Sequence, residues 1–155
     1  MIYIGVDPGA DGALATLYED GCIAVVDCPS TFFKMARLVE GYKDMTVMVG
    51  IEKVNPFYKS AAKSAFAFGA NFAAWQTAFA CFHIPYELIS PRIWQKATIG
   101  PTKGLDTKEL SCGQAEILYP RAQLKTPRGR MLDGRCDALM IATYLKIKYE
   151  GAFMA

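Results

Sequence analysis

The chain has 155 residues, and its 17 Lys and Arg against 15 Asp and Glu give a formal net charge of +2 at pH 7 with the one histidine neutral. This length predicts a single domain over residues 1–155 that can bury a core without disulfide bonds. The mild charge does not indicate a polyanion partner, so a basic face must come from local clustering. The five cysteines have neither a CxxC pair nor a zinc spacing with the histidine, and no signal peptide is predicted. We therefore expect reduced, buried thiols in a cytoplasmic protein.

The N-terminal stretch predicts a buried strand that ends in an acid. The apolar, β-branched run of residues 2–6 is followed by Asp7 and then by a Pro-Gly turn. Residues 13–18 and 22–27 are the next two predicted strands, so Asp7 lies at one end of a hairpin. A lone buried carboxylate is costly unless it is paired or bound to a metal, although Asp7 could also cap its own turn.

A later strand ends in the same way. Ser30 or Thr31 can cap a helix that runs to about residue 42. The next apolar run, T-V-M-V-G-I-E, ends at Glu52 before an Asn-Pro pair breaks it. Two acids, each at the end of an apolar strand, suggest a shared site.

A long helix is predicted over residues 59–82. Its uncharged part, residues 64–82, approaches the length of a membrane span, but it is rich in alanine and carries polar residues. We therefore expect a buried or dimer-forming helix and no membrane span. One aromatic stripe and a second apolar face around Phe66, Ala70 and Ala73 would need two partners, the core and another subunit. The alternative is a single, fully buried core helix. The stripe consists of Phe68, Phe72, Trp75, Phe79 and Phe82.

The second half predicts one strand and three helices. The strand covers residues 85–89, and the helices begin near Pro91, Thr107 and Asp133. The order βββαβαβααα indicates an α/β fold with a mixed sheet. Before the last helix, five cations within fifteen residues form either a phosphate-binding footprint or a solvated loop; they are Arg121, Lys125, Arg128, Arg130 and Arg135.

The last helix adds two acids. Asp133 and Asp137 are four residues apart, which puts both on one helix face, although capping and the helix dipole also explain them. Asp137 directly precedes an apolar run and so points toward the body of the protein. Together with Asp7 and Glu52, these oxygen ligands could hold two Mg²⁺ ions for phosphodiester cleavage. We expect the fold to bring Asp7, Glu52 and Asp137 within reach of one ion.

Three segments resemble the acidic motifs of the RuvC-type Holliday junction resolvases, most closely the variant found in phages. They are I-G-V-D-P-G-A-D-G-A-L-A, I-E-K-V and D-G-R-C-D-A-L-M-I-A. The resemblance covers nearly the whole chain, because S-P-R-I-W-Q-K and the lysine in D-T-K-E-L also match. It implies an RNase H-like fold, with a five-stranded mixed sheet flanked by helices in one nuclease domain. It also implies a homodimer that cuts four-way and other branched DNA with two Mg²⁺ ions per site, for which Mn²⁺ can substitute.

The resemblance also implies individual roles. Asp7 would bridge the two metals, Glu52 and Asp137 would each hold one ion, and Asp133 would be the fourth acid. Many cellular members carry an acid or histidine three residues before the last Asp, where this chain has Gly134. The implied DNA contacts are the lysines near the scissile phosphate, the aromatic after the glutamate motif and the basic loops; they are Lys96, Lys103, Lys108, Phe57, Tyr58 and the five cations of residues 121–135.

Other functions fit parts of the pattern. A ribonuclease H or a less specific nuclease would share the fold. An actin-like ATP-binding module could share the first motif, but the chain lacks a second phosphate-binding glycine loop. A catalytically inactive DNA-binding relative would not need the intact acid set. If the chain is encoded by a phage, it would act in the cytoplasm of the bacterial host.

Overall fold

The fold is built on one five-stranded mixed sheet. The computed structural model describes residues 1–53, 62–101 and 104–153. The strands lie in the order β3-β2-β1-β4-β5, with β1, β2 and β3 antiparallel and with β4 and β5 parallel to β1. Their bounds are β1 Ile2–Asp7, β2 Ala13–Leu17, β3 Ile23–Asp27, β4 Val47–Glu52 and β5 Tyr86–Ile89. The predicted α/β fold with a mixed sheet is confirmed.

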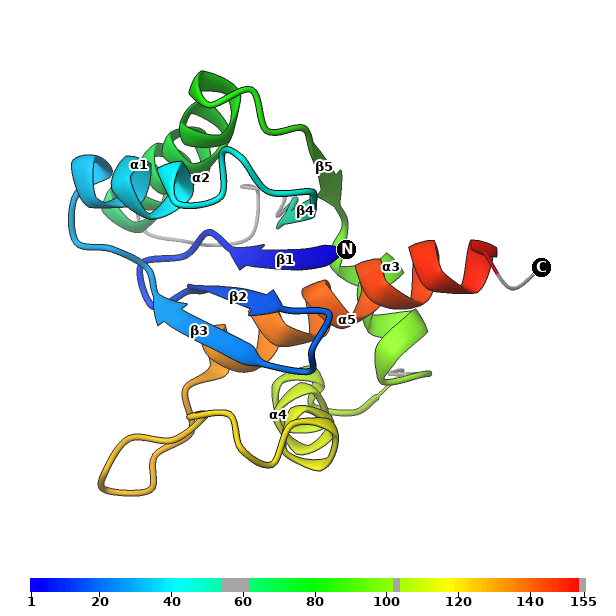
Figure 1. Cartoon of the computed structure of the whole chain (residues 1–155). Helices are drawn as coiled ribbons and strands as arrows, with labels where there is room; N and C mark the ends of the chain where they lie inside the picture. Colours follow the sequence, from blue (N-terminus) through cyan, green and yellow to red (C-terminus); the bar gives the residue numbers. More distant parts are fainter. Residues whose placement is uncertain (54–61, 102–103, 154–155) are drawn as a thin grey trace.

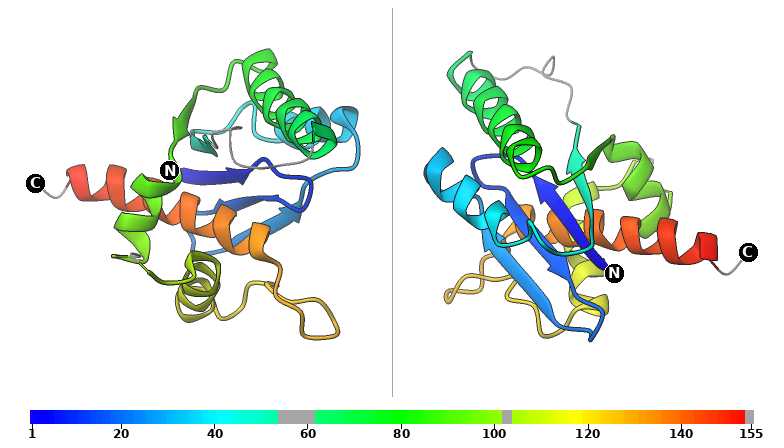
Figure 2. Two further views of the ribbon diagram at one scale, coloured as in Figure 1. Left: turned by 180° about the vertical axis from the view of Figure 1, so that it is seen from behind. Right: turned by 45° about the horizontal axis from the view of Figure 1, so that its top comes forward.

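Helices cover both faces of this sheet. In Figures 1 and 2, α5 crosses one face, whereas α1 and α2 lie on the opposite side. The helices α3 and α4 pack against α5, outside it. The helix bounds are α1 Phe32–Glu40, α2 Ala62–Cys81, α3 Pro91–Thr98, α4 Thr107–Leu118 and α5 Asp133–Phe153. No helix in the described ranges is both long and apolar enough to cross a membrane.

The helix starts follow the signals in the sequence. The Thr31 side chain accepts a hydrogen bond from the Lys34 backbone, and Asp106 caps α4 in the same way through two backbone N–H groups. Pro91 occupies the first position of α3. The cysteines are all free, but Cys22 and Cys81 are exposed. The expectation that all five thiols are buried is therefore wrong.

The pleat of β1 and β4 sends the two strand-end acids to the same face. Ile4 and Val6 of β1 belong to the core beneath α1 and α2, so the alternate residues Tyr3 and Asp7 face α5. Val6 is opposite Ile51 in the parallel register, and Ile51 also belongs to the α1–α2 core. Glu52 therefore faces α5, as Asp7 does.

Glycine lets α5 approach the strands closely. A Cβ atom on Gly5 of β1 would lie 2.1 Å from the Ala138 carbonyl oxygen and 2.5 Å from the Ala142 backbone nitrogen of α5. No larger residue fits there without moving the helix. Because Asp137 directly precedes Ala138, this close approach also sets the height of Asp137 above β1.

Candidate active site

Asp7 and Glu52 end two adjacent parallel strands, so they lie at the same edge of the sheet. This is the edge at which open α/β sheets generally bind ligands. The Asp7 Oδ1 atom accepts a hydrogen bond of 3.2 Å from the Gly9 backbone N–H. Burial raises the pKa of Asp7, and the Gly9 hydrogen bond and the charge of Lys108 only partly oppose this effect.

Glu52 is the most strongly perturbed acid of the group. Its residue is only 8% exposed, and its Oε1 atom accepts a hydrogen bond of 2.9 Å from the indole N–H of the fully buried Trp94. Burial raises the pKa of Glu52 to about 8, and the charges of Asp7 and Asp137 add to the effect. The Trp94 hydrogen bond acts in the opposite direction. Loss of hydration is thus the main physical cause, and repulsion between like charges is the second.

Asp137 reaches the same region from the start of α5. Its Oδ1 atom accepts a hydrogen bond of 2.7 Å from the buried Ser111 hydroxyl of α4. Burial raises the pKa of Asp137 to about 6, the Ser111 hydrogen bond opposes this, and the charge of Asp7 adds to it. The charge of Asp7 thus raises the pKa of both Glu52 and Asp137.

Asp133 has a different environment. Its Oδ2 atom lies 3.3 Å from the Lys108 Nζ atom, and these side chains are 46% and 69% exposed, respectively. The hydrogen bond to Asp133 raises the pKa of Lys108. The neighbouring Gly134 packs so closely that a Cβ atom there would lie 2.2 Å from the Asp11 carbonyl oxygen. The acid or histidine that many RuvC-type resolvases carry at this position therefore cannot be accommodated here.

A cleft with a volume of about 620 Å³ joins all of these acids except Glu52, which is not among its lining residues. It is lined by Asp7, Asp133 and Asp137, with Lys108 and Arg130 at its wall. None of the acids Asp7, Glu52 and Asp137 forms an ion pair with a lysine or arginine of the described residues. Asp7 and Asp137 thus bring carboxylates into the cleft that form no ion pair with a described side chain.

The carboxylates do not converge as tightly as the sequence led us to expect. Among the described residues, no three Asp, Glu, His or Cys side chains are grouped so that they could hold one ion as they stand. Asp7, Glu52 and Asp137 each accept one hydrogen bond from a separate uncharged donor. The donor set itself fits a hard divalent cation, because it consists of carboxylate oxygens at the edge of an acidic cleft.

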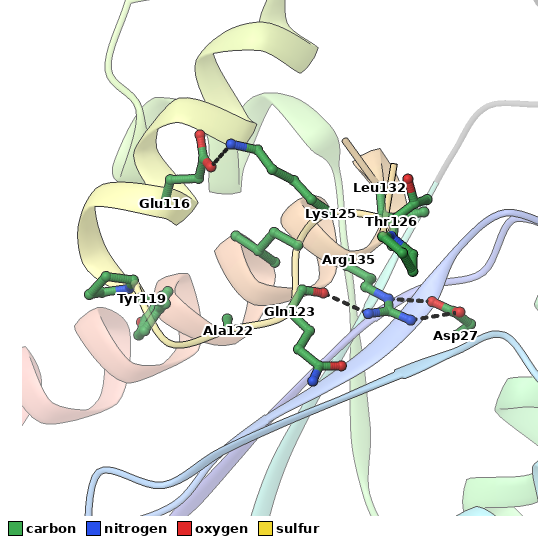
Figure 3. A pocket seen from close by; sticks show the side chains of 12 residues that line it. Asp27, Glu116, Tyr119, Ala122, Gln123, Lys125, Thr126, Leu132 and Arg135 are labelled. Atoms are coloured by element: carbon green, nitrogen blue, oxygen red, sulfur yellow. Dashed lines mark hydrogen bonds and ion pairs between the residues drawn. The ribbon is translucent and has the colours of Figure 1, made fainter. Parts of the chain in front are cut away.

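The basic segment before α5 borders a second, larger cavity of about 840 Å³ (Figure 3). Arg135 fills one wall and pairs with Asp27 at the end of β3 through two hydrogen bonds of 2.5 and 2.8 Å. Its third nitrogen donates to the Gln123 carbonyl oxygen at 2.6 Å. Arg135, predicted to contact DNA, thus has every guanidinium nitrogen engaged within the protein. Lys125 pairs with Glu116 across the same cavity.

The remaining cations of this segment are exposed. Residues 125–131 form a small hairpin, closed by hydrogen bonds of Thr126 with Arg130 and by a turn in which Gly129 has φ +83°. Arg128 lies in this turn, and Arg130 lines the acidic cleft. Neither of them, nor the exposed Arg121, is ion-paired within the part of the chain that the structure describes.

The other predicted DNA contacts are farther along the chain. Lys96 is exposed on α3. Phe57, Tyr58 and Lys103 lie outside the described residues.

Three residues of this region were given no role from the sequence. Asp27 also follows an apolar strand, so the pattern that singled out Asp7 and Glu52 could have found it. Trp94 and Ser111 could not be found in that way, because they meet their acids only through tertiary contacts across 42 and 26 residues.

Neither models of protein families nor curated proteins match this sequence. Among solved structures, RuvC of Thermus thermophilus aligns over 97% of this chain and 97% of its own, with a TM-score of 0.64 and 18% sequence identity. T. thermophilus RuvC in complex with a Holliday junction substrate aligns over 97% and 96%, with a TM-score of 0.64 and 16% identity. The yeast mitochondrial Holliday junction resolvase Ydc2 aligns over 97% and 81%, with a TM-score of 0.42 and 15% identity. The likeness to RuvC shows that the chain has the RNase H-like fold of that protein, as predicted.

Proposed function

We propose that this chain is a divalent-metal-dependent endonuclease that cleaves four-way DNA junctions. The observation that carries the proposal is the group of three carboxylates with raised pKa, the buried Glu52 and the half-buried Asp7 and Asp137, on one edge of a RuvC-like fold. Burying several unpaired acids together is unfavourable, and a bound cation would remove the penalty. The solved complex of RuvC with a Holliday junction supports a branched DNA substrate.

The three carboxylates would hold the metal. Two Mg²⁺ ions bound there, or Mn²⁺ in their place, would stabilise charge on the attacking and leaving oxygens of the phosphodiester. Asp133, with Lys108 paired to it, lies at the rim of the cleft, where the lysine can contact a substrate phosphate. The raised pKa values of Glu52 and Asp137 mean that cation binding releases protons from these groups.

The basic surface beside the cleft would bind the DNA backbone. Arg121, Arg128 and Arg130 are exposed, and Arg130 lines an acidic cleft that would repel DNA unless cations are bound in it. Arg130 lines the cleft itself, so a strand held there would place a phosphate close to the carboxylates. Lys96, Lys103, Phe57 and Tyr58 complete the proposed DNA contacts.

We also propose that the enzyme is a homodimer that pairs through α2. Trp75 and Phe79 of this helix are buried in the core, whereas Phe66 is 81% exposed and Ala73 is exposed on the outer face. This outer face is apolar and has small residues that would let a second helix approach closely. A four-way junction has two-fold symmetry, so a two-fold dimer would place one site on each of two strands.

Cleavage of matched substrates tests the proposal. Synthetic four-way junction, linear duplex of the same sequence and RNA–DNA hybrid would each be incubated with Mg²⁺, with the Asp7→Asn variant as the control. We expect cleavage of the junction alone by the wild type and none by the variant, which should still bind the junction in Ca²⁺. Preferential cleavage of the hybrid would instead indicate a ribonuclease H. Equal cleavage by Asp7→Asn would place the metal site elsewhere.

A further inference from the structure

Five acids at or near the cleft differ in what binds them. Asp27 and Asp133 are paired with the cations Arg135 and Lys108. Asp7, Glu52 and Asp137 have only uncharged donors: a backbone N–H, an indole N–H and a hydroxyl group. The cation-paired side chains are 61% and 46% exposed, whereas Glu52 is 8% exposed as a residue. The more buried acid therefore lacks the cation that would stabilise it best.

We propose that Trp94 and Ser111 are positioning residues, which each hold one oxygen of a cation-binding carboxylate and leave the other oxygen free for the ion. The proposal rests on the proposed function, because it takes Glu52 and Asp137 as metal ligands. Nothing in the family resemblance assigns a role to either residue.

The geometry of the two contacts supports this role. The Trp94 indole N–H lies 2.9 Å from Glu52 Oε1, and the Ser111 hydroxyl lies 2.7 Å from Asp137 Oδ1. Both donors are fully buried, with 0% exposure, so neither can turn away to water. No other hydrogen bond to these two carboxylates is made by a described residue. The second oxygen of each acid is thus left for a ligand.

The chemistry of the donors also supports it. An arginine or lysine in place of Trp94 would neutralise Glu52 and compete with a divalent cation for the same charge. An indole N–H or a hydroxyl fixes the orientation of the carboxylate but leaves its full negative charge to the ion. Uncharged donors at these two positions make the metal-free protein less stable than cationic partners would. A bound cation would compensate for this loss of stability.

The outer helices have a function in this arrangement. Trp94 lies on α3, and its indole ring belongs to the core formed by α5 and its neighbours. This packing fixes the position of the ring. Ser111 lies on the face of α4 that packs toward α5, beside the buried Cys112 and Ala115. Packing of α3 and α4 on α5 therefore sets the orientation of the two carboxylates, one through each helix.

A pair of identical substitutions tests the role of Trp94. Trp94→Phe removes the indole N–H and keeps an aromatic ring. Trp75→Phe is the matched control, because Trp75 is also fully buried but its Nε1 finds no nitrogen or oxygen acceptor among the described residues. Binding of Mg²⁺ to each protein, without DNA, would be measured by calorimetry. We expect Trp94→Phe to bind Mg²⁺ about 10–100-fold more weakly than wild type, the usual cost of losing such a supporting contact, and Trp75→Phe to bind normally.

Two further readouts separate positioning from a merely structural role. In the Trp75→Phe protein, Trp94 is the only tryptophan left of the two in the chain, so its fluorescence should change when Mg²⁺ is added. Junction cleavage by Trp94→Phe should recover toward the wild-type rate as Mg²⁺ is raised, with KM for the junction unchanged. A loss of cleavage that excess Mg²⁺ does not restore would indicate a structural defect and overturn the proposal.

Ser111→Ala keeps the proposal testable if Trp94→Phe does not fold. It should weaken Mg²⁺ binding by a similar factor through Asp137. Wild-type affinity in both folded variants would overturn the inference and leave the proposed nuclease function intact. If the wild-type protein binds no Mg²⁺ but cuts junctions, the positioning roles fail together with the metal site, whereas a protein that binds Mg²⁺ but cuts no DNA refutes only the proposed function.

Discussion

Replacing Glu52 with glutamine should stabilise the metal-free protein while abolishing its activity. Burial beside Asp7 and Asp137 raises the pKa of Glu52 from its ordinary value of 4.5 to about 8. Each tenfold change in proton affinity corresponds to about 1.4 kcal/mol, so the ionised Glu52 costs the folded state up to about 5 kcal/mol. Glutamine has nearly the same shape, can still accept the Trp94 hydrogen bond and carries no charge. Burying its amide offsets part of the gain, and we expect a net stabilisation of about 2–4 kcal/mol.

The sign of the pH dependence follows from linkage. Because the folded state holds the proton of Glu52 more tightly than the unfolded state, stability falls as pH rises from about 4.5 to about 8 and is constant above that range. Glu52→Gln should therefore be less stable than the wild type near pH 4.5, by the cost of its buried amide, and gain on it increasingly up to about pH 8.5, where the net stabilisation is reached. Asp137, with its pKa raised to about 6, adds a smaller loss of stability in the lower part of this range in both proteins.

Urea unfolding in EDTA at several pH values measures the effect. The exposed Glu109 offers a matched control, because Glu109→Gln makes the same substitution outside the site. Adding Mg²⁺ should stabilise the wild type by about 2.7 kcal/mol at a concentration 100 times its Kd, and Glu52→Gln by much less. A difference between wild type and Glu52→Gln that is the same at low and high pH would refute the reasoning, since Glu52 would then not be held with a raised pKa.

Three further predictions follow from the surroundings of the cleft. Asp133→Asn should retain partial cleavage and regain more in Mn²⁺, because Asp133 is paired with a lysine; equally complete loss in Asp133→Asn and Asp137→Asn would reject this ranking. Arg128→Ala should reduce the slope of log K for junction binding against log salt concentration by about 1. Arg135→Ala should leave this slope unchanged and lower thermal stability, since Arg135 donates its hydrogen bonds to Asp27 and Gln123 within the protein. Ala73→Glu, on the exposed face of α2, should yield a folded monomer of half the dimer mass in sedimentation at low micromolar concentration. This monomer should lose paired incision. Concerted cleavage of both strands by this variant would show that α2 does not pair the sites.

Much of the fold could be predicted from the sequence because its signals are local. The β-branched runs that end in Asp7 and Glu52, the cap at Thr31 and the proline at Pro91 each act within a few residues. The order of strands and helices along the chain then limits the fold to a mixed sheet with helices on both faces. The observed order is the predicted one.

The partners of the acids could not be predicted in the same way. Arg135 meets Asp27 across 108 residues of chain, so a segment that looked uniformly basic contains one arginine with an internal role. The sequence also does not show which of two acids on one helix face pairs with a cation. Asp133 pairs with Lys108, whereas Asp137 accepts a hydrogen bond from the Ser111 hydroxyl. These distinctions depend on side-chain contacts between elements and not on the period of any single element.

The close approach of α5 to β1 keeps Asp137 near Asp7, so the spacing of these acids depends on helix packing as well as on the local sequence motifs. Gly5 allows the helix backbone to contact the strand, and Gly134 allows its first turn to contact the backbone at Asp11. A side chain at either position would lift α5 away from the sheet edge and separate Asp137 from Asp7. The glycines therefore enforce the repulsion between the acids as well as their proximity. Because the packing of a whole helix maintains this repulsion, the fold can hold a charge cluster that isolated side chains would relieve by moving apart.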